Sequence, residues 1–118
     1  MGQPVAFFEV ISPEPKRAQE FYGELFGWHV AEGSGMEGYA LVDTGAGESA
    51  VGGGIGPSQG PGDAGVKIYM RVDDLDTYIT RAEQLGGAPL VPPMDLPGDF
   101  GRIAVIADPD GNPVGLWA

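Results

Sequence analysis

Two segments of this chain carry the same pattern, and that repetition strongly limits what the chain can fold into. Phe7–Ser12 leads into a helical segment that ends at Leu25-Phe26-Gly27. Lys67–Val72 leads into another that ends at Leu85-Gly86-Gly87. In both copies, apolar stretches and glycine-rich returns follow the helix. Each copy is therefore predicted to fold as β-α-β-β-β, with matching positions of the two copies facing each other around a cavity.

The first copy has the clearer helix. Its apolar residues recur at helical spacing and predict a buried stripe, formed by Ala18, Phe21, Tyr22, Leu25 and Phe26. Gly27 is expected to end this helix, because glycine readily takes the left-handed conformation. The strands of this copy are expected at residues 5–11, 28–32, 39–44 and 50–55.

The second copy follows a linker expected at residues 57–65, which is rich in glycine and proline. Asp73 or Asp74 is expected to cap its helix. Apolar residues recur along that helix at Leu75, Tyr78, Ile79, Ala82 and Leu85. Strands are expected at residues 90–91, 102–107 and 113–117, with an irregular loop at residues 92–101.

Composition excludes several classes of function. The chain of 118 residues has six basic and seventeen acidic side chains, a net charge of −11. Such a surface disfavours nucleic acids and anionic membranes as partners. The charge fits simple solubility, or attraction of a cationic ligand. There is no cysteine, no apolar run long enough to span a membrane and no secretory signal, so a cytoplasmic location is expected.

The order and spacing of several motifs resemble the glyoxalase/bleomycin-resistance/dioxygenase superfamily, the vicinal oxygen chelate proteins. The motifs are Arg17-Ala18, Phe21-Tyr22, Leu25-Phe26-Gly27-Trp28, Val72-Asp73-Asp74-Leu75, Leu85-Gly86-Gly87 and Asp108-Pro109-Asp110-Gly111-Asn112-Pro113. The resemblance implies an α+β fold in which two βαβββ modules, with mixed and curled sheets, enclose a cavity.

The same resemblance sets the expected organisation. Residues 1–118 would form a single glyoxalase-like domain, with modules at residues 3–56 and 66–118. It also implies a homodimer, whose cavity is built within one chain or from modules of two chains.

The resemblance further implies where a metal would bind. Metal-using members place one ligand on the first strand and one on the last strand of each module. The corresponding residues here are Phe7, Gly53, Lys67 and Gly115. Phenylalanine and glycine side chains donate nothing, and protonated lysine is a poor ligand. The single histidine, His29, has no neighbouring donor. We therefore expect a metal-free protein with no cofactor.

Strand alternation sorts the remaining side chains between two faces. One face is apolar and is expected to pack under the helices; it carries Phe8, Val10, Ile68, Met70 and Val72. The other is mixed and is expected to line the cavity; it carries Phe7, Glu9, Ile11, Lys67, Tyr69 and Arg71. Glu9 could pair with Arg71 or Lys67 in a salt bridge that only closes the sheet and has no role in binding. Alternatively, these polar groups could anchor a ligand.

Further ligand contacts are expected around this face. Gly53 and Gly115 have no side chains, so extra volume is expected at these two positions, where the resemblance implies metal ligands. Met94, Phe100 and Trp117 are candidate walls, and Asp99 or Arg102 could also touch the ligand. Residues 92–100 form a candidate lid over the cavity, or a connection without a role.

These observations predict a protein that binds a small organic molecule in a curled-sheet cavity. The alternative is a metal-independent lyase or isomerase, in which Glu9 acts as acid or base and Tyr69 polarises an oxygen. A metal-dependent glyoxalase or dioxygenase would follow from the fold alone, and fold does not fix function.

Overall fold

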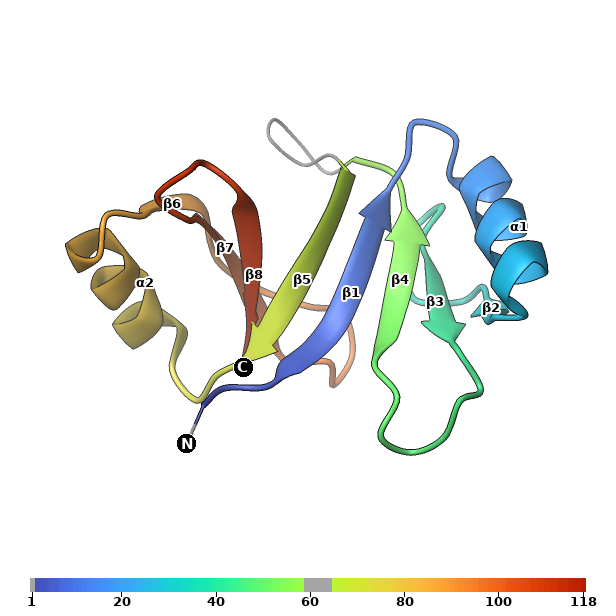
Figure 1. The fold of residues 1–118 in the computed structure, drawn as a ribbon, viewed down its shortest axis with the longest axis horizontal. Coiled ribbons are helices and arrows are strands. Elements are labelled where there is room, and N and C mark those ends of the chain that lie inside the picture. Colours follow the sequence, from blue (N-terminus) through green and yellow to red (C-terminus); the bar gives the residue numbers. More distant parts are fainter. Residues whose placement is uncertain (1, 59–64) are drawn as a thin grey trace. The chain divides into compact units, whose positions relative to one another are not determined.

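The computed structural model describes residues 2–58 and 65–118 of the chain (Figure 1). The chain divides into two compact units, Phe7–Val66 and Lys67–Ala118 with Met1–Ala6. We call them the N-terminal and the C-terminal unit. Residues 59–64 of the predicted linker lie outside the described residues.

The N-terminal unit is a four-stranded mixed sheet with one helix. Its elements are β1 (Val5–Ile11), α1 (Pro15–Phe26), β2 (His29–Ala31), β3 (Ala40–Asp43) and β4 (Gly52–Gly56). The strands lie in the order β2-β3-β4-β1. β1 and β4 are parallel, whereas β2–β3 and β3–β4 are antiparallel.

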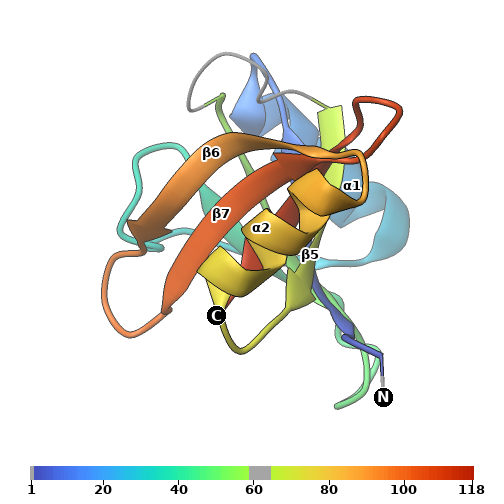
Figure 2. The ribbon, with the colours of Figure 1, turned by 90° about the vertical axis from the view of Figure 1, so that its left-hand side faces the viewer.

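The C-terminal unit repeats this arrangement. Its elements are β5 (Gly65–Arg71), α2 (Leu75–Gln84), β6 (Ala88–Asp95), β7 (Arg102–Ala107) and β8 (Pro113–Trp117). The strand order is β5-β8-β7-β6, again with the first and last strands parallel and the others antiparallel. Figure 2 shows α2 lying across the strands of its own unit. The predicted β-α-β-β-β repeat and the α+β class are confirmed.

Each unit has an apolar core between its sheet and its helix. In the N-terminal unit, Val10, Val42 and Ile55 form this core, with Phe8 and Tyr22 packed against them. In the C-terminal unit the core consists of Val72, Leu75, Ala104 and Leu116, with Met70 and other apolar side chains packed against it. The predicted assignment of Phe8, Val10, Met70 and Val72 to the helix-covered faces is confirmed; Ile68, however, is partly exposed.

The predicted buried stripe of α1 is confirmed for two of its five residues. Ala18 and Tyr22 pack against the core, but Phe21, Leu25 and Phe26 are 57%, 59% and 55% exposed. A helix on one face of a small sheet buries a narrow stripe, and the predicted set spanned too wide an arc. On α2, Leu85 is likewise exposed. Gly27 ends α1 in the left-handed conformation, as predicted, with φ of 69°.

A short strand was predicted at residues 90–91 and a long loop at residues 92–101, but much of this segment is strand. β6 runs through Pro92 and Pro93 to Asp95, and its pairing with β7 shifts register twice. Within its unit, β6 is an edge strand. Proline is tolerated at an edge, because the missing N–H costs no ladder hydrogen bond there. None of the described helices is long and apolar enough to cross a membrane.

Asp74 caps α2, and its carboxylate sets a pH dependence. The Thr77 hydroxyl donates to Asp74 Oδ2 at 2.7 Å, and the Asp76 amide donates to Oδ1 at 3.2 Å. The Thr77 hydrogen bond, followed by the backbone amides, lowers the pKa of Asp74. A lowered folded-state pKa stabilises the fold above the unfolded-state pKa, and this stabilisation is lost as the pH falls through the folded-state value.

We therefore expect Asp74→Ala to lower the urea midpoint at pH 7, because α2 loses its cap. The difference from wild type should shrink as the pH is lowered, since the wild-type carboxylate is then protonated. Asp73→Ala removes the same charge next to the cap and is the control. Equal losses in the two variants at pH 7 would contradict a capping role for Asp74.

Candidate functional site

The N-terminal unit carries a carboxylate on the sheet face that points away from α1. Glu9 on β1 pairs in register with Gly54 on β4, and Gly54 pairs with Leu41 on β3. The Tyr39 hydroxyl donates to Glu9 Oε2 at 2.7 Å. Glu9 is half-buried and Tyr39 is buried. The tyrosine thus fixes the direction of a carboxylate on this face.

Gly53 is not part of this face, which corrects the sequence prediction. Gly53 pairs with Phe8, and a Cβ atom built on Gly53 would overlap the Phe8 ring on the helix-covered side. The glycine on the face of Glu9 is Gly54, where a Cβ would overlap Tyr39. A shift of one residue along a strand moves a position to the opposite face, so the prediction chose the wrong glycine.

The C-terminal unit has a cation–aromatic row on its face away from α2. Arg71, Trp117, Ile103 and Met94 are successive partners across β5, β8, β7 and β6. The Arg71 guanidinium carbon lies 4.4 Å from the centre of the Trp117 ring. Arg71, Trp117 and Met94 were predicted as ligand contacts, and the structure brings them together on one face of one sheet.

The neighbouring row holds the second predicted glycine. Tyr69 pairs with Gly115, and a Cβ on Gly115 would overlap the Tyr69 ring. Extra volume was expected at Gly53 and Gly115, but an aromatic ring occupies the space at each. Lys67, two residues before Tyr69 on the same face, is buried. Phe7, its counterpart on β1, is half-buried.

Of the other predicted contacts, Phe100 lies in the turn between β6 and β7, and Arg102 is the first residue of β7. The Trp117 indole donates to the Phe100 carbonyl at 2.6 Å, and the Leu96 amide donates to the Gly101 carbonyl at 2.8 Å. Arg102 Nε lies 3.0 Å from Asp95 Oδ1. The predicted lid at residues 92–100 therefore needs correction: residues 92–95 belong to β6, and hydrogen bonds hold the remaining turn to β8 and to itself.

The positions implied as metal ligands carry poor donors. Phe7 and the glycines offer no side-chain donor, and Lys67 is a poor ligand while protonated. Among residues 2–58 and 65–118, no three His, Asp or Glu side chains gather closely enough to hold a metal ion. His29 is exposed on β2.

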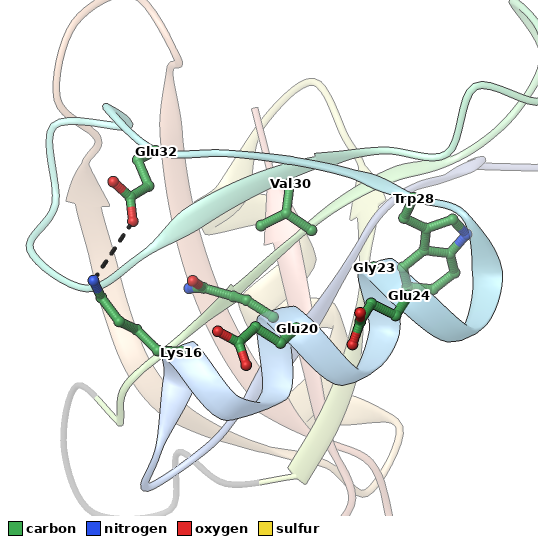
Figure 3. Close-up of a pocket in the computed structure, with 8 residues that line it drawn as sticks. Lys16, Glu20, Gly23, Glu24, Trp28, Val30 and Glu32 are labelled. Atoms are coloured by element: carbon green, nitrogen blue, oxygen red, sulfur yellow. Dashed lines mark ion pairs between the residues drawn. The ribbon is translucent and has the colours of Figure 1, made fainter.

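A separate groove lies on the other side of the N-terminal unit, between α1 and β2 (Figure 3). Its volume is about 560 Å³. It is lined by Lys16, Gln19, Glu20, Gly23, Glu24, Trp28, Val30 and Glu32. Of these residues, only Trp28 was singled out from the sequence, as part of the motif Leu25-Phe26-Gly27-Trp28. Gln19 could have been noticed, because it lies three residues before Tyr22 and so on the buried side of the helix.

Comparison with known proteins places the chain in a family. The family model described as "Glyoxalase-like domain" matches residues 7–117. This chain belongs to the glyoxalase-like domain family. A glyoxalase/bleomycin resistance protein/dioxygenase superfamily member from Vibrio splendidus has a similar structure, with a TM-score of 0.64 and 15% identity over 98% of this chain and 97% of that one. The resemblance found in the sequence is thereby confirmed.

Two curated relatives are closer in sequence. A protein of Mycobacterium tuberculosis with the provisional name glyoxylase CFP32 is 34% identical over 85% of this chain and 40% of its own length. The anthracycline biosynthesis protein DnrV of Streptomyces peucetius is 32% identical over 98% of this chain and 46% of its own length. The chain thus spans less than half the length of these relatives.

The contact of Tyr39 with β4 can be tested with two glycines of one strand. Gly54→Ala should lower the free energy of unfolding by about 1–3 kcal/mol, because the added methyl group displaces the Tyr39 ring. Gly52→Ala is the control, since the nearest atom to a Cβ there is the Val42 carbonyl oxygen at 3.5 Å. Urea unfolding measures both. Equal stability of the two variants would show that Tyr39 does not occupy the space beside Gly54.

Proposed function

We propose that this protein binds a small, partly aromatic organic molecule without a metal ion. The ligand would lie against the sheet face of the C-terminal unit that points away from α2. The observation that carries this proposal is the row of Arg71, Trp117, Ile103 and Met94 on this face. It joins a cation, an aromatic ring and apolar side chains, a combination suited to an amphipathic ligand.

The chemistry of the predicted ligand positions supports the metal-free part of the proposal. Divalent cations require imidazole, carboxylate or other oxygen donors. Phe7, Lys67 and Gly115 supply none, and Gly54, on the face of Glu9, is also without a side chain. These residues do not fit a metal ion, so no step of the proposed function involves one.

The name of one relative suggests a class of ligand to test. DnrV is described as an anthracycline biosynthesis protein. Anthracyclines contain fused aromatic rings, which could stack beside Trp117 and Arg71. An anthracycline is therefore a rational first probe.

Glu9 supports a second candidate function, a metal-independent lyase or isomerase. The Tyr39 hydroxyl holds this half-buried carboxylate in one direction on the sheet face. A fixed carboxylate beside a bound molecule can transfer a proton.

The protein would act as a homodimer in the cytoplasm, with a small molecule rather than nucleic acid or a membrane as its partner.

Binding can be tested by thermal shift and calorimetry with an anthracycline aglycone, which lacks the sugar. A bound ligand raises the melting temperature of the native state. Arg71→Gln should weaken binding about threefold or more, because the stacked cation is lost. Arg81→Gln, at an exposed position on α2, is the control for loss of charge. If Arg71→Gln and Arg81→Gln bind the probe as wild type does, the row around Trp117 is not the binding surface.

Glu9→Gln distinguishes the two candidate functions. It keeps the size of the side chain but cannot act as a base. A binding protein should retain ligand affinity and turn over no candidate substrate, with or without the substitution. An isomerase or lyase should instead lose turnover while binding is retained.

Metal content is checked by elemental analysis of protein purified without chelators. We expect far less than one equivalent of any transition metal per chain, because the predicted ligand positions lack donors. One equivalent that is retained through dialysis would contradict the metal-free proposal.

A further inference from the structure

The groove between α1 and β2 carries a fixed, unused hydrogen-bond acceptor. Gln19 is only 9% exposed. Its Nε2 group donates to the Ile55 carbonyl at 2.9 Å and to the Gly38 carbonyl at 3.1 Å. Both N–H groups of the amide are thereby used by the backbone. These bonds also settle the orientation of the amide, since both partners are acceptors.

The remaining polar atom of this side chain is the carbonyl oxygen Oε1. Among the described residues it has no hydrogen-bond partner. No side-chain nitrogen or oxygen that is fully buried in the described part of the chain lacks a partner, so Oε1 must reach accessible surface. Gln19 lines the groove. The groove therefore presents an acceptor whose direction is already fixed, ready for a ligand that donates a hydrogen bond.

Three carboxylates line the same groove as Gln19. Glu20 and Glu24 lie on α1, and Glu32 follows β2 (Figure 3). The one cation in the lining, Lys16, lies 3.9 Å from Glu32, with both side chains largely exposed. Such an exposed pair contributes little, and the lining keeps a net charge of −2 from three glutamates and one lysine. The groove favours a positively charged ligand.

An aromatic wall completes the groove. The Trp28 ring stacks on Tyr22, with centroids 5.8 Å apart and an angle of 8° between the planes. It also lies 5.2 Å from the rings of Phe8 and Phe26. Trp28 also lines the groove, together with Val30. Indole is the best aromatic partner for an organic cation.

We propose that this groove is a second binding site, specific for an organic ammonium ion with an aromatic or apolar body. The ammonium group donates to Gln19 Oε1 and is attracted by Glu20 and Glu24, while the body of the ligand lies along Trp28 and Val30. The site is on the helix side of the N-terminal unit and does not depend on the function proposed for the opposite sheet face.

The test uses 2-phenylethylammonium chloride as the probe and the two tryptophan indole N–H signals in ¹H–¹⁵N spectra as the readout. Trp28 and Trp117 are the two tryptophans of the chain, and Trp117→Phe assigns their signals. The Trp28 signal should shift in a saturable manner at low salt, with a dissociation constant in the millimolar range or below, about that of a small ligand in an open site. Phenylacetate, the matched anion, should cause no saturable shift.

Two pairs of variants separate a site from general charge attraction. Glu20→Gln combined with Glu24→Gln should weaken binding of the probe about three- to tenfold, the expected effect of two exposed charges. Glu48→Gln combined with Glu83→Gln removes the same charge elsewhere and should change the affinity less than about twofold. Both acidic pairs are exposed, so folding should be preserved.

Gly23→Ala tests the shape of the groove at constant charge. The new methyl group would meet the Trp28 carbonyl oxygen at 3.4 Å and Val30 Cγ2 at 3.5 Å, so the helix tolerates it while the groove narrows. Binding of the probe should weaken. The proposal is overturned if the Trp28 signal does not saturate, if phenylacetate acts alike, if the control pair weakens binding equally, or if Gly23→Ala binds as wild type does.

Discussion

The packing of aromatic rings over strand glycines is the contact on which the rest of the structure depends. Phe8 covers Gly53, Tyr39 covers Gly54 and Gly56, and Tyr69 covers Gly115. A glycine in a strand has no side chain to pack, and a neighbouring ring restores the lost contact. The rings also decide what each face can do. Tyr39 reaches Glu9 only because β4 carries no side chain at Gly54.

Much of the fold could be predicted because its signals are local and repeated. The β-α-β-β-β order, the residues of β1, β7 and β8, and the αL cap at Gly27 follow from alternation, helical spacing and turn residues. The prolines of β6 led to the prediction of a loop. Proline is compatible with a strand at the edge of a sheet, but which strand lies at an edge depends on the order of the strands.

The candidate site was harder to predict, because it depends on how neighbouring strands align. The choice between Gly53 and Gly54 depends on the register of β1 and β4, which a sequence pattern fixes only to within a residue. Arg71, Trp117 and Met94 were all predicted as ligand contacts. Their order across the sheet could not be predicted, because it depends on how four strands pair. The exposed Phe21 and Leu25 show the same limit, since helical spacing cannot tell how wide a stripe the sheet covers.

The net charge of the chain does not predict which ligand a given surface attracts, because it sums over surfaces that differ in charge. Of the six basic residues, Lys67 and Arg71 lie on one face of β5, and Arg71 stacks on Trp117. The groove beside α1, in contrast, gathers three glutamates around one lysine. The attraction of a cationic ligand that the charge of −11 suggests therefore belongs to the groove and not to the sheet face of the C-terminal unit. Because screening limits each field to about 8–10 Å at ordinary salt, the charges nearest to a surface, rather than the total charge, decide which class of ligand it attracts.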